Sequence, residues 1–213
     1  MAGRHFCVSF AAQQDLNTCL QIGQSVMLDN GAFSVYTRGA KFDERGFYDW
    51  IEPVLAPPHW AVIPDSIGGT VEDQHKMLSR FPRETFGYAN VSAVFHLNLP
   101  LSHLHFLVNA YPRVCLGSSG EFWDVGSAKW EHRMDEIFNY LLRKNRVMPY
   151  IHGMRMLGQC GGRWPMASAD STNVAQNHNR IGCAECMAEK IDAIQPRARW
   201  SAKQIQMAIW EPK

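Results

Sequence analysis

The sequence predicts an α/β fold, a (β/α)8 TIM-type barrel that is complete or one strand short. Short apolar strand candidates alternate with amphipathic helix candidates, and a parallel strand connection needs a crossover long enough to hold a helix. Seven strands can be read, one fewer than in a closed barrel. The first strand is not followed by Gly-x-Gly-x-x-Gly, which disfavours a dinucleotide-binding sheet. An open doubly wound sheet is the alternative.

The first half of the predicted barrel contains four strands and one long insertion. The strand candidates are residues 5–10, 25–29, 60–64 and 92–97. Helices are predicted at residues 15–20 and 71–80. The insertion covers about residues 33–58, after the second strand. Phe47, Trp50, Ile51 and Leu55 mark one helical face in it, and Pro57-Pro58 ends that helix.

The second half contains three further strands and the clearest helix. The strand candidates are residues 113–116, 147–151 and 164–170. Helices are predicted at residues 101–110, 129–143, 183–194 and 202–209, so the C-terminal segment of about 183–213 is helical. The helix at 129–143 has the strongest pattern, with an apolar stripe at Met134, Ile137, Phe138, Leu141 and Leu142.

Composition sets broad limits on the protein. A chain of 213 residues is long enough for one sizeable core, so we expect a single domain over residues 1–213. With 21 Lys and Arg against 20 Asp and Glu, the net charge of +1 does not by itself indicate a nucleic-acid binder. No signal peptide and no apolar run of membrane-spanning length is visible, so we expect a cytoplasmic protein with no membrane partner.

Polar residues follow the predicted strands at the point where each strand ends. They are Asp29, Asp65, His96, Asn98, Gly117, Ser118, His152, Gly153 and Asp170. In a parallel barrel these ends lie on one face, and clustered carboxylates shift one another's pKa as acid/base or nucleophilic chemistry requires. The alternative for each Asp is a helix cap, and Asp170 or Ser171 would cap the helix that follows.

Three features suggest a flat heterocyclic ligand. The Gly117-Ser118-Ser119-Gly120 turn lets a ligand approach the backbone closely. Asp65 is expected to accept N–H groups of a purine-like base, while Phe33 from the insertion stacks on its face. His96, His152 and Gly153 complete the predicted substrate-binding set.

Four short motifs, in this order, resemble the tRNA-guanine transglycosylases. Asp29-Asn30-Gly31-Ala32-Phe33-Ser34 is similar to their Asp-Ser-Gly-Gly-Phe-Gln signature. Residues 114–121, Val-Cys-Leu-Gly-Ser-Ser-Gly-Glu, are similar to their Gly-rich base-recognition loop. Tyr150-Ile151-His152-Gly153 resembles the strand end before their nucleophile, and Ala169-Asp170-Ser171 falls where that nucleophilic Asp is expected. The match spans about residues 26–177.

The resemblance is closest to reduced transglycosylase-like proteins, related to the enzymes that insert 7-deazaguanine bases into the DNA of phages and bacteria. It implies a TIM barrel in which an Asp attacks the anomeric carbon of a nucleotide, expels the base and forms a covalent glycosyl-enzyme. By this resemblance Asp170 would be the nucleophile, Asp29 the general acid/base and Asp65 a base-recognition carboxylate. Gly117 and Ser118 would contact the base through their backbone, and the chemistry needs no cofactor.

The chain departs from this family in two places. The Leu-Pro-Thr-Arg that follows the nucleophile in the tRNA enzymes is replaced by residues 172–177, Thr-Asn-Val-Ala-Gln-Asn, which leaves the substrate open. The family's zinc site has three closely spaced Cys and a later His, of which Cys183-x-x-Cys186 remains. A structural zinc on these two cysteines with Cys160 and His178 is one interpretation, and two reduced thiols are the other.

The leading hypothesis is N-glycosidic bond chemistry on a nucleic-acid base, by base exchange or by base excision. DNA is favoured over tRNA as the partner, and a free modified base would be the second substrate of an exchange. A non-catalytic module that binds bases or nucleic acid is one alternative. A metal-dependent barrel hydrolase is the other, because mixed His and Asp strand ends also suit a binuclear metal site. The oligomeric state is left open.

Overall fold

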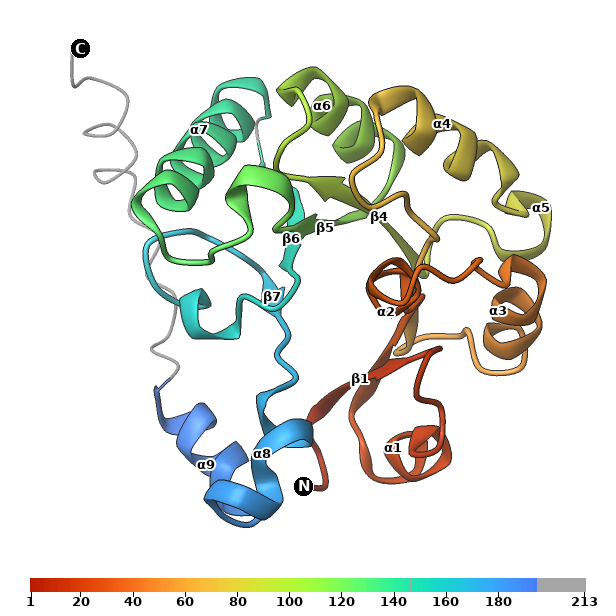
Figure 1. The fold of residues 1–213 in the computed structure, drawn as a ribbon, viewed down its shortest axis with the longest axis vertical. Coiled ribbons are helices and arrows are strands. Elements are labelled where there is room, and N and C mark those ends of the chain that lie inside the picture. Colours follow the sequence, from red (N-terminus) through yellow and green to blue (C-terminus); the bar gives the residue numbers. More distant parts are fainter. Residues whose placement is uncertain (146, 195–213) are drawn as a thin grey trace. The chain divides into compact units, whose positions relative to one another are not determined.

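Strands and helices alternate along the chain. The structure, a computed structural model, describes residues 1–145 and 147–194 (Figure 1). Within these residues the strands form a seven-stranded sheet in their order of sequence. They are β1 (His5–Ser9), β2 (Ser25–Asp29), β3 (Trp60–Val62), β4 (Val91–His96), β5 (Arg113–Gly117), β6 (Tyr150–Gly153) and β7 (Ser168–Ala169). Parallel pairing joins β1 to β2, β2 to β3, β3 to β4 and β6 to β7.

The helices confirm most of the predicted pattern. In the described chain they are α1 (Leu16–Ile22), α2 (Ala32–Thr37), α3 (Glu44–Ile51), α4 (Val71–Arg80), α5 (Arg83–Phe86), α6 (Leu101–Ala110), α7 (Ala128–Lys144), α8 (Asn173–Ile181) and α9 (Ala184–Ile194), with 3-10 turns at Gly120–Phe122 and Leu157–Gln159. The sequence does not predict α2 and α5, which are too short for a readable period. The helix expected at 202–209 lies outside the described residues.

The fold is therefore α/β, as the sequence predicts. Its strand order is that of a (β/α)8 barrel, and an incomplete barrel is compatible with it. None of the helices in residues 1–145 and 147–194 is long and apolar enough to cross a bilayer.

The described chain divides into two compact units. Unit 1 comprises residues 1–95 and 107–115, and unit 2 comprises residues 96–106 and those from 116 onward. The elements β4, α6 and β5 contribute residues to both units. The single-domain organisation expected from the sequence stays a prediction.

Unit 1 is built on the buried strands β2, β3 and β4, whereas β1 has a single buried residue, Val8. β1 pairs with β2 from His5 opposite Ser25 to Ser9 opposite Asp29, and all of β3 is buried. Strands of a covered parallel sheet have continuous apolar runs instead of an alternating pattern. Helix α3 is anchored by Phe47, whose ring centroid lies 5.6 Å from that of Phe10 and 6.1 Å from that of Trp50. A helix is thus confirmed in the insertion, but it ends at Ile51, so Leu55 lies outside it and Pro57-Pro58 does not end it.

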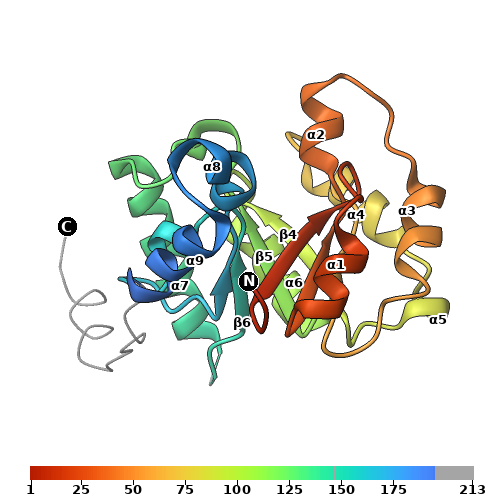
Figure 2. The same ribbon diagram turned by 90° about the horizontal axis from the view of Figure 1, so that it is seen from below.

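Unit 2 contains the strongest predicted helix, α7. Its buried stripe comprises Trp130, Met134, Ile137, Phe138 and Leu141, close to the predicted stripe. Ser127 caps the helix, because its side chain accepts a hydrogen bond from the amide of Trp130. Helices α8 and α9 pack side by side in the same unit, as Figures 1 and 2 show.

The last two strands begin later than predicted. β6 starts at Tyr150 instead of 147, because Pro149 has no N–H to donate and Val147 is 81% exposed. β7 has two residues, since the chain turns at Pro165, where the Met166 amide donates to the Trp164 carbonyl at 2.9 Å. Both strands still end at the predicted functional residues.

Candidate functional site

In unit 1, Asn30 links the two predicted carboxylates Asp29 and Asp65. The Asn30 side chain is buried, and its Nδ2 donates to Asp65 Oδ1 at 2.8 Å and to the Ile63 carbonyl at 2.8 Å. Its Oδ1 accepts from the Ala32 amide at 2.8 Å. The sequence analysis treats Asn30 only as part of a motif, but its side chain holds Asp65 next to the end of β2.

The turn after β2 requires glycine at position 31. Gly31 has φ of 73°, and a Cβ there would lie 3.0 Å from the Ala11 amide nitrogen. Its amide donates to Asp29 Oδ2 at 3.1 Å. Helix α2 begins directly afterwards, and it carries Phe33 with 36% of its surface exposed. The proposed stacking of Phe33 on a base stays a prediction.

In unit 2, the Asp170 carboxylate is held through one of its two oxygens. The His152 Nε2 lies 3.2 Å from Asp170 Oδ1, and the Arg155 amide donates to the same oxygen at 3.0 Å. Within the described chain both hydrogen bonds to this carboxylate go to Oδ1, and Oδ2 accepts neither. The side chain is 14% exposed. Among the described residues, Oδ1 is thus anchored and Oδ2 is not.

Asp170 does not cap the helix that follows it. Helix α8 has Thr172 at its N-cap position without a side-chain cap, and Ser171 Oγ accepts from the Asn173 amide at 3.1 Å. The capping alternative considered for Asp170 is therefore wrong, whereas Ser171 does bond to an amide at the start of the helix. The orientation of Asp170 toward β6 therefore has a cause other than capping of α8.

The backbone between β6 and β7 fixes the position of Asp170. Its amide donates to the Gly153 carbonyl at 3.2 Å, and the Leu157 amide donates to its carbonyl at 3.1 Å. A Cβ at position 153 would lie 2.6 Å from Met166 Sδ and 2.9 Å from Met156 Cβ. Only glycine therefore fits this predicted site position without displacing the chain beside Asp170.

His152 connects Asp170 to Ser168. The His152 side chain is 4% exposed, and its Nδ1 lies 2.8 Å from Ser168 Oγ. In the neutral imidazole, the tautomer that donates Nε2–H to Asp170 accepts the Ser168 hydroxyl proton at Nδ1. The Tyr150 hydroxyl contacts Ser168 Oγ at 3.4 Å, which continues the chain of contacts toward the surface. The structure thus brings His152 and Asp170 together, as the strand-end argument predicts.

The Gly-rich turn is fixed by groups on other elements of unit 2. Ser118 is buried, its Oγ accepts from Trp130 Nε1 at 2.9 Å, and its carbonyl accepts from Arg155 Nη2 at 3.3 Å. The Gly117 carbonyl accepts from the Leu97 amide at 3.1 Å. Each carbonyl of the predicted base-binding pair therefore accepts one hydrogen bond from the protein, and its second lone pair can still accept another.

Arg155 joins three of these segments, and the sequence analysis does not single it out. Besides its contacts to Asp170 and Ser118, its guanidinium carbon lies 4.5 Å from the centroid of the Trp123 ring. It is the one non-glycine residue with positive φ, 58°, in the described chain. Burial lowers the pKa of its guanidinium, and the negative charge of Asp170 opposes that shift.

The other predicted site residues are His96 and the candidate zinc ligands. His96 is buried at the end of β4. Cys183 and Cys186 form a disulfide, whereas the sequence analysis weighs metal ligands or reduced thiols, and His178 Nδ1 lies 3.1 Å from the Val174 carbonyl of its own helix. No three His, Cys, Asp or Glu side chains in residues 1–145 and 147–194 gather as a metal site. Zinc at these cysteines stays a prediction that requires reduced thiols.

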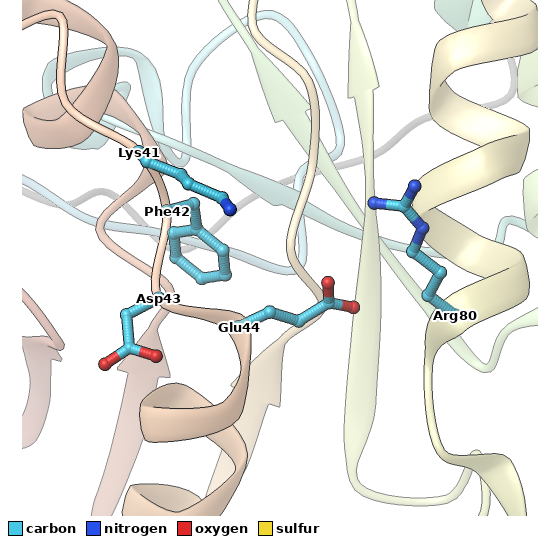
Figure 3. Close-up of a pocket in the computed structure, with 5 residues that line it drawn as sticks. All are labelled: Lys41, Phe42, Asp43, Glu44 and Arg80. Carbon is cyan, nitrogen blue, oxygen red and sulfur yellow. The ribbon is translucent and has the colours of Figure 1, made fainter.

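A hollow of about 510 Å³ in unit 1 lies apart from these residues (Figure 3). It is lined by Lys41, Phe42, Asp43, Glu44 and Arg80. Asp43 already caps α3 by accepting from the Gly46 amide at 3.0 Å. The lining contains none of the predicted site residues, and its two acids and two bases favour neither an anion nor a cation.

Comparison with models of known protein families finds none that matches this chain, and comparison with curated proteins finds no match. The family membership expected from the motifs therefore rests on those motifs alone.

Proposed function

We propose that this protein acts on the N-glycosidic bond of a nucleic-acid base, with Asp170 as the nucleophile. The observation that carries the proposal is the one-sided anchoring of the Asp170 carboxylate, with His152 and the Arg155 amide on Oδ1. An incomplete (β/α)8 barrel is the fold that we propose for this chemistry.

In the proposed reaction, Asp170 Oδ2 attacks the anomeric carbon of the nucleotide. The C–O bond of a glycosyl ester forms as the C–N bond breaks, and the bonding electrons leave with the base. The carboxylate also stabilises the oxocarbenium-like character that develops at the sugar. A free base that attacks the ester gives exchange, and water gives excision. A target in a duplex has to be flipped out first.

The second acid of this reaction is assigned by the resemblance. Asp29 would protonate the departing base and Asp65 would accept its N–H groups. Within unit 1 the buried amide of Asn30 fixes Asp65 beside the turn that contains Asp29. DNA is the proposed polymer, with a 7-deazaguanine as the exchanged or released base.

A serine nucleophile is the second candidate. The contact chain from Ser168 through His152 to Asp170 contains the three groups of a serine hydrolase. In that reaction Ser168 would attack an ester and Asp170 would only orient the imidazole. The two candidates therefore predict opposite effects of removing the hydroxyl and of removing the carboxylate.

The test is incubation of the protein with 7-deazaguanine-modified DNA, unmodified DNA and tRNA. We expect release of a base and a protein–nucleic acid adduct that survives a denaturing gel. Asp170→Asn keeps the shape and the Oδ1 acceptor, and it is expected to lower base release by more than about 10³-fold. The matched control is Asp192→Asn, which alters an exposed carboxylate on α9 and is expected to leave release unchanged.

Ser168→Ala separates the two candidates. We expect it to lower base release by less than about tenfold, because it removes only the contacts of the hydroxyl to His152 and Tyr150. Loss of hydrolysis of a simple aryl ester in Ser168→Ala, with no base release by the wild-type protein, would favour the serine hydrolase. Unchanged base release in Asp170→Asn would refute the nucleophile assignment.

A further inference from the structure

Trp123 is a half-exposed tryptophan next to the Gly-rich turn. It directly follows the 3-10 turn Gly120–Phe122, and 51% of its surface is exposed. Tryptophan usually buries most of its surface, because its ring is the largest apolar group that a protein carries. An exposed indole beside a functional segment is typical of a surface on which a flat ring stacks.

Arg155 supports this indole and connects it to Asp170. Its guanidinium packs over the Trp123 ring, while its amide donates to Asp170 Oδ1 at 3.0 Å. The amide contact would be made by any residue except proline, so holding Asp170 does not require an arginine side chain. The φ of 58° favours glycine at this position. What arginine adds here is a guanidinium, at the expense of a less favourable backbone.

We propose that the Arg155–Trp123 pair binds a nucleotide of the strand that carries the target, adjacent to the nucleotide that Asp170 attacks. This inference rests on the proposed function. A nucleotide has both groups that the pair recognises, since its base can stack on an indole and its phosphate can accept the fork of a guanidinium. An acidic peptide has the anion without the ring, and a free base has the ring without the anion.

The pair reads features that every nucleotide shares, so it adds affinity without sequence preference. Stacking on Trp123 should be sensitive to the aromatic face and insensitive to salt. A phosphate contact of Arg155 releases counterions, so it should appear in the salt dependence of binding. These two signatures separate the two residues in a single titration series.

The experiment measures binding of fluorescein-labelled single-stranded DNA and RNA by anisotropy, with the full chain in an Asp170→Asn background that prevents turnover. Trp123→Ala is expected to weaken binding roughly 10- to 100-fold, and Trp123→Phe to retain it within about fivefold. Arg155→Gly is expected to weaken binding and to reduce the slope of log affinity against log salt by about one. The DNA and RNA probes show which polymer the pair prefers.

Two controls keep the outcome interpretable. Phe106→Ala removes another exposed aromatic ring of unit 2, 46% exposed on α6, and is expected to leave affinity unchanged. Arg155→Ala lacks the same guanidinium as Arg155→Gly but keeps the strained backbone, so Arg155→Gly should melt no lower than Arg155→Ala. If Arg155→Gly and Arg155→Ala both lose binding but do not both lose stability, the lost affinity is due to the missing guanidinium.

The inference is overturned if Trp123→Ala binds as tightly as Trp123→Phe, if Phe106→Ala weakens binding equally, or if neither probe binds the parent protein. Base release is measured in parallel with an intact Asp170. If the protein releases a base while Trp123→Ala binds normally, only the role of the pair fails. If no base is released while Trp123→Ala loses binding, the proposed reaction fails and the nucleotide site stands.

Discussion

At the scale of single residues, His152 controls how Asp170 is presented. His152→Phe keeps a ring of similar size but removes the donor to Asp170 and the acceptor for Ser168. Asp170 would then keep only the Arg155 amide on Oδ1 and would sample other rotamers. If His152 only orients the proposed nucleophile, the rate constant for base release should fall about 10- to 100-fold with little change in KM, whereas a raised KM would indicate the substrate-binding role predicted from the sequence.

Tyr150→Phe is the matched control for His152→Phe, because it removes only a hydroxyl at 3.4 Å from Ser168 on the same strand. Its base release should stay within about twofold of the parent. An equal fall of the rate constant in both variants would contradict a positioning role for His152. A change in KM and thermal stability without a change in the rate constant would contradict it as well.

The predicted carboxylates and the missed arginine show what a strand-end pattern can reveal. Asp170 and Asp29 were predictable because each directly follows an apolar run. Arg155 lies two residues beyond β6, inside an irregular turn with no period, and nothing in its residue type signals a positive φ. The role of Asn30 beyond its motif was not predictable, since the contacts of its buried amide are to Ile63 and Asp65, which are distant in sequence.

At the scale of elements, α4 shows a boundary that local sequence determines. Thr70 Oγ accepts from the Asp73 amide at 3.2 Å, and Asp73 Oδ2 accepts from the Thr70 amide at 3.0 Å. This capping box satisfies amides that the first turn leaves unpaired, and it depends on residues three apart. The helix accordingly has the bounds that the sequence predicts.

Thr70→Ala is expected to lower the free energy of unfolding by roughly 1 kcal/mol at neutral pH. The hydrogen bonds from the Thr70 amide and hydroxyl lower the pKa of the Asp73 carboxyl. A carboxyl with a lower pKa in the folded state stabilises the fold above its unfolded pKa, and that stabilisation is lost as pH falls through the folded value. The Thr70→Ala effect should therefore shrink in acid, as thermal denaturation at several pH values would show.

An effect of Thr70→Ala that is constant down to acid pH would argue against the contribution of Asp73. Asp73→Asn is the companion variant, and it should show the same trend because it removes the charge and keeps one acceptor.

In contrast to α4, the strands β6 and β7 start later than the sequence predicts. The two strands start after Pro149 and Pro165, which have no N–H to donate to a neighbouring strand. Whether a missing N–H ends the pairing depends on which strand lies beside the proline, and the local sequence does not show this.

At the scale of the whole molecule, the state of the cysteines distinguishes a disulfide from a metal site. The structure has one disulfide, Cys183–Cys186, and its free cysteines are Cys7, Cys19, Cys115 and Cys160. We expect thiol titration in denaturant to find four thiols, and six after reduction. Six thiols without reductant, together with release of one zinc ion per chain, would instead establish the metal site.

The alternation of strands and helices made the α/β class predictable, because short apolar runs and the helical period of 3.6 are local properties of the sequence. The division into two units was not predictable in the same way. It passes through β4, α6 and β5, whose sequences read as ordinary buried elements. Which half of an element belongs to which unit depends on contacts that are distant in sequence.

The shortness of β7 has a consequence for how the protein responds to heat. This strand has two residues, and the Ala167 and Asp170 amides, which donate to β6, flank it. Because β7 has so few hydrogen bonds to β6, its free energy of local opening should be much lower than that of the buried strands β2 and β4. Amide hydrogen exchange at Asp170 should accordingly be faster than at Val26 or Phe95. If Asp170 is the nucleophile that we propose, warming should abolish base release reversibly below the unfolding temperature, because its segment opens while the core stays folded.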